Sequence, residues 1–236
     1  MKNKIHLAGL TVALCLAVGA PAVRANTYQL DDGTAEDAVG AGNADLIALN
    51  QFTVIGNQNM IMSISIAWGS PNVPDPTLNG LTYTAVIWSD PNNDGNPNDA
   101  QVIATAPGVI TGAGTNTFDV TLFPTCPTVT RSFFVGFIIT GNDNQYPAGF
   151  DETAPLSNRS FAAVGAAGMG DIYNLNNNLL PVDAVENYGL DGNFMIRADA
   201  CAVPEPPSLA LAAIGGMVGV FIYRRKRQGL LQPGLV

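Results

Sequence analysis

Residues Ser132–Thr140 read SFFVGFIIT, a short run of aromatic and β-branched residues that is typical of a β-strand. Comparable runs recur along the chain, and most of them alternate apolar and polar residues with a period of two. Gly, Asn, Asp and Pro, the residues that turns prefer, fill the gaps between them. The other predicted strands are Leu46–Ile55, Met60–Trp68, Leu81–Trp88, Gln101–Thr105, Thr115–Leu122, Ser160–Val164 and Asn193–Ala198.

This series of strands predicts the fold class of residues 26–202. No long stretch of this region shows the 3.6-residue period of an amphipathic helix. About eight strands separated by turns indicate an all-β domain, an antiparallel β-sandwich of jelly-roll type, with a barrel as the alternative. Residues Ala166–Pro181 are rich in Gly and Asn and are expected to form a surface loop over the sandwich.

The central region contains many more acidic than basic residues. Eighteen acids stand against three arginines (Arg131, Arg159 and Arg197), a net charge of −15, and the region has neither Lys nor His. A nucleic-acid partner is therefore not expected, because phosphate contacts need clustered Lys and Arg. The arginines are expected to form ion pairs or to cover apolar surface with their stems; binding of an acidic sugar is the alternative.

The same composition excludes several enzyme classes. Ser-His-Asp and Cys-His catalysis need a His, and Schiff-base catalysis with Lys needs a Lys, which residues 26–202 lack. Glycoside hydrolysis needs only two carboxylates, and Asp151–Glu152 or Asp183 with Glu186 are candidate pairs. A non-catalytic domain is the expectation, and an exported carbohydrate-active enzyme is the alternative.

Two tryptophans end predicted strands, Trp68 and Trp88. We expect both to pack inside the sandwich, as large aromatic side chains usually do. A platform that stacks against sugar rings is the alternative.

Cysteine use agrees with an oxidising compartment. Cys15 lies in the N-terminal leader, which leaves Cys126 and Cys201 in the central region. Two Cys in an exported domain predict one disulfide, and two free buried thiols are the alternative.

The sharpest candidate for a binding site is Asp90–Asp99, which reads DPNNDGNPND. Oxygen-bearing side chains stand at its first, third, fifth and seventh positions, and Gly95 stands at the sixth. This resembles the first half of an EF-hand calcium loop. Gln101 replaces the bidentate Glu at the twelfth position, and strands replace the helices, so the segment is not an EF-hand. An ordinary hairpin tip is the alternative reading.

The predicted calcium ligands are Asp90, Asn92, Asp94, Asn96 and Asp99. Calcium is the one cofactor that the sequence suggests. A second acidic cluster, Asp31, Asp32, Glu36 and Asp37, is a weaker candidate for a cation site, and a solvated loop is the alternative there.

The N-terminus reads as a secretory signal peptide, residues 1–25. Lys2 and Lys4 form its positive region, Leu7–Val18 is apolar, and Val23-Arg24-Ala25 offers small residues for cleavage after Ala25. Residues 26–202 are therefore expected outside the cytoplasm.

The C-terminus has three elements in a fixed order. Val203-Pro204-Glu205-Pro206 precedes an apolar segment, Leu209–Tyr223, and a basic cluster follows it. The cluster, Arg224, Arg225, Lys226 and Arg227, marks the cytoplasmic side of a short membrane-spanning helix, residues 208–223. Residues 229–236 would then be a short cytoplasmic tail.

This arrangement, residues 203–228, resembles the PEP-CTERM sorting signal of Gram-negative bacteria. The resemblance implies recognition and processing by a membrane-embedded exosortase after export by the secretion machinery. It also implies transient anchoring in the inner membrane, followed by release to the cell surface or extracellular matrix. The predicted function is thus an exosortase-sorted surface or matrix protein, whose β-sandwich contributes structure or associates with extracellular polysaccharide.

Overall fold

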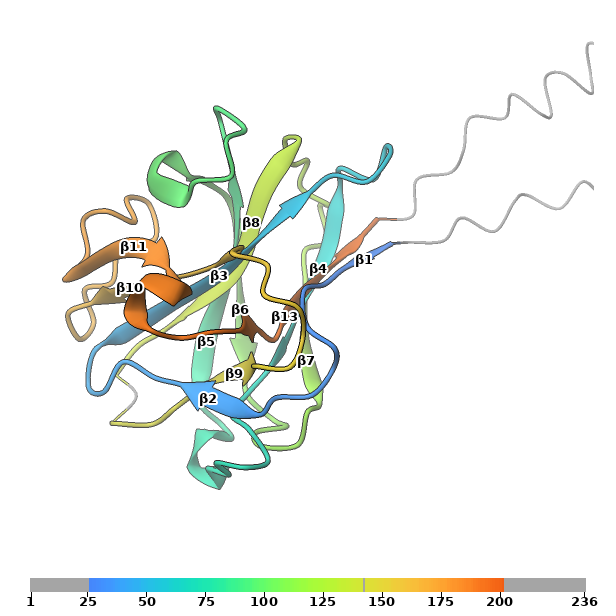
Figure 1. Ribbon diagram of the computed structural model, residues 1–236. Coiled ribbons are helices and arrows are strands. Elements are labelled where there is room, and N and C mark those ends of the chain that lie inside the picture. Colours follow the sequence, from blue (N-terminus) through green and yellow to red (C-terminus); the bar gives the residue numbers. More distant parts are fainter. Residues whose placement is uncertain (1–25, 142, 202–236) are drawn as a thin grey trace, which may run out of the picture. The chain divides into compact units, whose positions relative to one another are not determined.

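The computed structural model describes residues 26–141 and 143–201, and their strands pair antiparallel throughout (Figure 1). These residues belong to one compact unit, Ala25–Ala202, which has its own core and meets the description of a domain that folds by itself. The predicted signal peptide, sorting tail, membrane-spanning helix and cytoplasmic tail lie outside the described residues.

The strands of the described residues form three sheets, whose members follow in spatial order. The largest has six strands: β11 (Leu180–Ala184), β10 (Ser160–Gly165), β3 (Asp45–Thr53), β8 (Ser132–Ile139), β5 (Thr82–Ser89) and β6 (Gln101–Val109). The second has four: β1 (Thr27–Tyr28), β13 (Ile196–Ala200), β4 (Ile61–Ala67) and β7 (Phe118–Leu122). The smallest has three: β12 (Asn193–Phe194), β9 (Ala148–Asp151) and β2 (Asp37–Val39). Three 3₁₀ helices lie between strands: η1 (Pro76–Leu78), η2 (Pro97–Asp99) and η3 (Val185–Tyr188).

Strand β8 lies inside the six-stranded sheet, between β3 and β5, and all eight of its residues are buried. Side chains of a strand alternate between the two faces of its sheet. Phe133, Val135, Phe137 and Ile139 accordingly belong to one apolar cluster, whereas Phe134 and Ile138 belong to another. Both faces of this strand therefore have to be covered.

The four-stranded sheet covers the first face. Ile64 and Ile66 of β4 and Ile196 of β13 join the odd-numbered residues of β8 in a single cluster, which also contains Trp68. The rings of Trp68 and Phe137 lie 4.6 Å apart. The two larger sheets thus pack against each other across the main core.

Gly136 of β8 reflects how closely β3 approaches. A Cβ at this position would lie 2.0 Å from the carbonyl oxygen of Ala48, so no other residue fits without displacing the backbone of β3.

The long loop after β10 covers the second face. Ile172 and Leu175 of this loop are buried against Phe134, Ile138 and Trp88. Trp88 also donates from Nε1 to the carbonyl oxygen of Ile172 over 2.8 Å. The prediction of a loop over the sheet is confirmed, and the loop is part of the second core.

A buried carboxylate holds the same loop. Asp45, at the start of β3, is fully buried. Its Oδ1 accepts from the backbone N–H of Gly168 (2.9 Å) and Gly141 (3.2 Å), and its Oδ2 accepts from the backbone N–H of Gly170 (2.8 Å). These bonds satisfy a charge whose burial would otherwise be costly, and they fix the loop to the sheet.

The all-β class and the antiparallel sheets are confirmed. The jelly-roll type of sandwich and the terminal helices stay predictions. Both tryptophans are buried, Trp68 at 1% exposure and Trp88 at 0%, so the expectation of core packing is confirmed and the sugar platform is wrong. Among the described residues, no helix is long and apolar enough to cross a membrane.

The structure joins Cys126 to Cys201 in a disulfide, with Cα atoms 6.3 Å apart. The bridge closes a loop with a sequence separation of 75 residues. It ties the segment between β7 and β8 to the residue after β13. Both ends of the bridge lie beside the start of β4, since the N–H of Ile61 donates to the carbonyl of Pro127 and the N–H of Cys201 donates to that of Met60.

We predict that the exported protein carries this bridge and that the double substitution Cys126→Ser, Cys201→Ser weakens the domain. In the chain-entropy treatment, a loop of this length contributes about 4 kcal/mol to the free energy of unfolding. Mass spectrometry of unreduced peptides should find the two cysteines linked, and denaturant unfolding of residues 26–202 should give the energy. Free thiols on the exported protein would contradict the bridge.

Candidate cation site

The segment between β5 and β6 turns around the carboxylate of Asp90, which is fully buried. Its Oδ1 accepts from the backbone N–H of Asn93 over 2.9 Å, and its Oδ2 accepts from that of Gly95 over 2.8 Å. Asn93 (φ 59°) and Gly95 (φ 80°) both adopt the left-handed conformation that Asn and Gly tolerate best. The sequence Asn-Asp-Gly therefore allows the chain to curl around Asp90.

Short side chains cap the next part of the segment. Asp94 Oδ1 accepts from the backbone N–H of Asn96 (2.7 Å), and Asn96 Oδ1 accepts from that of Asn98 (3.0 Å). Asn96 is thus the N-cap of η2, and Pro97 follows at the first helical position. This helix brings Asp99 back toward the start of the segment.

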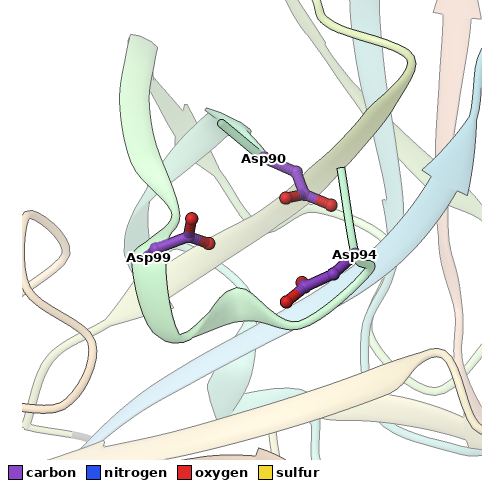
Figure 2. A group of neighbouring side chains, drawn as sticks. All are labelled: Asp90, Asp94 and Asp99. Carbon is purple, nitrogen blue, oxygen red and sulfur yellow. The ribbon is translucent and has the colours of Figure 1, made fainter. Parts of the chain in front are cut away.

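The result is a group of three carboxylates, Asp90, Asp94 and Asp99, which point toward one common space (Figure 2). One oxygen from each lies within 4.8 Å of the others. Calcium binds oxygen at 2.3–2.6 Å, so two ligands on opposite sides of one ion are separated by roughly 5 Å. The spacing of the three oxygens fits a single calcium ion between them.

Asp99 adds a further feature. Its Oδ1 is buried and makes no hydrogen bond within the described residues. The described part of the chain contains one ion pair, Arg197 with Asp31, so no arginine neutralises the group there. A divalent cation would provide both the missing ligand for this oxygen and the opposite charge.

Three of the five predicted ligands are thus brought together. Asn92 and Asn96 use their side-chain oxygens on the backbone N–H groups of Asp94 and Asn98, both at 3.0 Å. Gln101 is the first residue of β6. In an EF-hand the late carboxylate stands at the twelfth position, which Gln101 occupies here. The third carboxylate of this group is that of Asp99, two positions earlier, which is the last residue of η2.

The second acidic cluster does not form a group of this kind. Asp31 pairs with Arg197, whose guanidinium also lies 4.0 Å from the ring centre of Phe118. Hydrogen bonds from the side chain and backbone of Thr34 lower the pKa of Asp32. Glu36 Oε2 accepts from the backbone N–H of Glu152. The hydroxyl of Thr34 lies within hydrogen-bond distance of both Asp32 Oδ1 (2.6 Å) and Glu36 Oε1 (3.1 Å), so these carboxylates already have partners within the protein.

The carboxylates of the two candidate catalytic pairs, Asp151–Glu152 and Asp183 with Glu186, differ from one another in burial and in hydrogen bonding. Asp151 is fully buried, and its oxygens accept from the backbone N–H groups of Asp32, Thr153 and Ala154 at 2.6–2.9 Å. Asp183 is exposed and accepts from the side-chain amide of Asn187 over 2.7 Å. Both carboxylate oxygens of Glu186 are buried without a hydrogen-bond partner in the described structure, which no motif in the sequence indicates.

The remaining arginines, Arg131 and Arg159, are exposed. No ion pair to either is present among the residues that the structure describes, so the expectation of ion pairing holds for Arg197 alone.

Comparisons with known proteins identify the end of the chain. The PEP-CTERM protein-sorting motif matches residues 202–227. The match includes the predicted sorting residues, Val203, Pro204, Glu205, Pro206, Arg224, Arg225, Lys226 and Arg227, which lie outside the described residues. The described residues thus form an antiparallel all-β domain, and the chain carries a PEP-CTERM sorting motif, as the sequence predicted.

The other comparisons concern the chain as a whole. No curated protein sequence matches it. It is similar to a crystal structure of the cysteine protease and lectin-like domains of Cwp84, a surface layer associated protein of Clostridium difficile. The identity is 13% and the TM-score 0.49, and the match covers 74% of this chain and 35% of that one. The chain thus spans about a third of that structure's length.

We predict that calcium stabilises residues 26–202 and that Asp94→Asn removes this effect. The substitution keeps an oxygen for the N–H of Asn96 and removes one charge from the group. At a free calcium concentration of about 100 times Kd, binding adds ~2.7 kcal/mol, or roughly 5–10 °C in melting temperature for a domain of this size. Calorimetry with calcium and with chelator gives the shift.

Glu152→Gln is the matched control, because it removes an exposed charge outside the group and should leave the calcium response unchanged. In chelator, Asp99→Asn should raise the melting temperature, since it relieves repulsion between like charges. A domain that does not respond to calcium would show that this segment is an ordinary turn.

Proposed function

We propose that this chain is an exported protein of a Gram-negative bacterium, which an exosortase directs to the cell surface or extracellular matrix. The observation that carries the proposal is the sorting motif at residues 202–227. The exosortase would recognise its Pro-Glu-Pro start, apolar segment and basic cluster in the membrane. The domain itself would act after delivery.

The route follows from the order of the segments. Residues 1–25 would direct secretion, and residues 208–223 would hold the chain in the inner membrane, with the basic cluster on the cytoplasmic side. Residues 26–202 would then face the periplasm before release. The disulfide supports this placement, because such bonds persist in oxidising compartments.

We further propose that the delivered domain is a non-catalytic β-sandwich of jelly-roll type. It would contribute structure or associate with extracellular polysaccharide, and calcium bound by Asp90, Asp94 and Asp99 would stabilise it. The net charge of −15 in residues 26–202 suits a soluble surface domain.

The alternative is a carbohydrate-active enzyme that uses two carboxylates. Against it stands the environment of Asp151, whose oxygens are occupied by backbone N–H groups. Asp183 also differs from a catalytic carboxylate, since it is exposed and its Oδ1 accepts from the side-chain amide of Asn187. We therefore favour the non-catalytic role.

Deletion of residues 203–236 tests the sorting role. We expect the shortened protein to leave the surface fraction and to appear in the periplasm or medium, because it lacks both the recognition sequence and the membrane segment. Fractionation and immunoblotting of the native host measure the change. Surface display that persists after the deletion would contradict the proposal.

A second variant separates recognition from anchoring. Replacing Pro204, Glu205 and Pro206 with Ala keeps the apolar segment and basic cluster. This protein should accumulate unprocessed in the inner membrane. Pro233→Ala, beyond the basic cluster, is the control and should be sorted normally.

A further inference from the structure

The loop over the six-stranded sheet exposes three large apolar side chains, Met169, Tyr173 and Leu179, and the first two of them line the same pocket. Tyr173 is 73% exposed and Met169 is 75% exposed, although Ile172 and Leu175, in the same loop, are buried. Tyr and Met are enriched where proteins bind partners. Their exposure on a well-anchored element makes this part of the surface a candidate binding site.

The anchoring of the loop is extensive. Asp45 holds the backbone on both sides of Met169, and Trp88 holds the carbonyl group next to Tyr173. Asn178 closes the loop, because its Oδ1 accepts from the N–H of Asp171 (2.8 Å) and its Nδ2 donates to the carbonyl of Asp171 (3.0 Å). Two exposed side chains are thus presented in fixed positions, which lowers the entropy cost of binding.

Met169 and Tyr173 both line one pocket. It has a volume of about 410 Å³ and is formed by the loop together with Thr84 of β5 and Ile138 of β8. Met169 and Tyr173 contribute apolar surface to it, and Asp171 and Asn177 contribute polar groups. A few polar groups among apolar ones are typical of sites that orient a small ligand.

The polar side of the pocket offers both acceptors and donors. Asn177 donates to Asp171 Oδ2 over 3.1 Å and lowers the pKa of that carboxyl, and the backbone N–H groups of Asn174 and Tyr173 lower it further. An ionised Asp171 accepts hydrogen bonds from hydroxyl groups, whereas Thr84 and Asn177 both donate and accept.

The floor continues along the sheet beyond the loop. Thr84 pairs with Pro107 of the edge strand β6, and Thr82, two residues earlier on the same face, pairs with Val109. Thr82, Pro107 and Val109 are exposed. Exposed Thr, Pro and Val side chains thus continue from the pocket along β5 and β6.

We propose that Tyr173, with Met169, Asp171, Asn177 and Thr84, forms a binding site for a neutral extracellular polysaccharide. This inference rests on the proposed function and gives its polysaccharide association a location. The C–H face of a sugar ring stacks on the exposed ring of Tyr173, and its hydroxyl groups bond to Asp171 and Asn177. The neighbouring sugars lie along the exposed Thr, Pro and Val side chains of β5 and β6.

The charges favour this ligand over the other polymers of the cell surface. Neither Lys nor Arg lines the pocket, Asp171 contributes a negative charge, and residues 26–202 carry a net charge of −15. An anionic polysaccharide or a second copy of the domain would be repelled.

The test is affinity electrophoresis of residues 26–202 in native gels that contain galactomannan or xyloglucan as neutral probes and alginate as an anionic probe. We expect a neutral polysaccharide to retard the wild-type domain and alginate not to do so. Tyr173→Ala should reduce the affinity roughly tenfold or more, since removal of an exposed aromatic anchor commonly has such an effect. Tyr173→Phe should keep the affinity, because stacking needs only the ring.

Tyr146→Ala is the matched control, because Tyr146 is 53% exposed and does not line this pocket. Equal retardation of wild type and Tyr173→Ala would overturn the site and leave the proposed function intact. A wild-type domain that neither neutral polymer retards would overturn both the site and the polysaccharide association, while the tail deletion still tests sorting separately. Retardation by alginate alone, or loss of a dimer in Tyr173→Ala, would assign the surface to another occupant.

Discussion

Strand β8 is buried on both of its faces, and this burial determines how the layers around it are arranged. Because its side chains alternate, Phe133, Val135 and Phe137 need one partner layer, and Phe134 and Ile138 need another. The four-stranded sheet provides the first layer. The second is provided by a loop with little regular structure, which has to be held in place by specific bonds from Asp45 and Trp88.

The sequence predicted the parts that follow from local pattern. Long strands such as β3, β4, β5 and β8 were predicted because their composition and length are typical of strands. The carboxylates of Asp90, Asp94 and Asp99 were predicted as candidates because Asp, Asn and Gly stand at regular spacings in a turn. The PEP-CTERM motif was recognised because its three elements are contiguous.

Features that depend on tertiary contacts were missed. Strand β9 reads AGFD, and its Gly149 is needed because a Cβ would lie 2.8 Å from the carbonyl oxygen of Ala67. Strand β6 extends past its predicted end because Pro107 is tolerated in an edge strand. The roles of Asp45 and Tyr173 arise from residues that are far apart in sequence, which no spacing rule detects.

The part of the chain that carries the sorting signal differs from the part that carries the candidate binding sites. The C-terminal motif directs delivery, whereas the candidate sites for calcium and polysaccharide lie in the domain. The two sites are connected through the loop over β8, because Asn176 of that loop donates to the carbonyl of Asn98 in the calcium segment over 2.9 Å. Occupation of one site is therefore expected to affect the rigidity of the other.

The loop after β10 is part of the second core, so it should open only when the six-stranded sheet opens. Native-state hydrogen exchange, followed by NMR, tests this most directly, because each amide reports the free energy at which it opens. We expect the N–H groups of Gly168 and Gly170 to exchange as slowly as those of β8, because both would open only in global unfolding. Exchange of these two amides orders of magnitude faster than β8 would contradict it, since the loop would then open independently of the sheet.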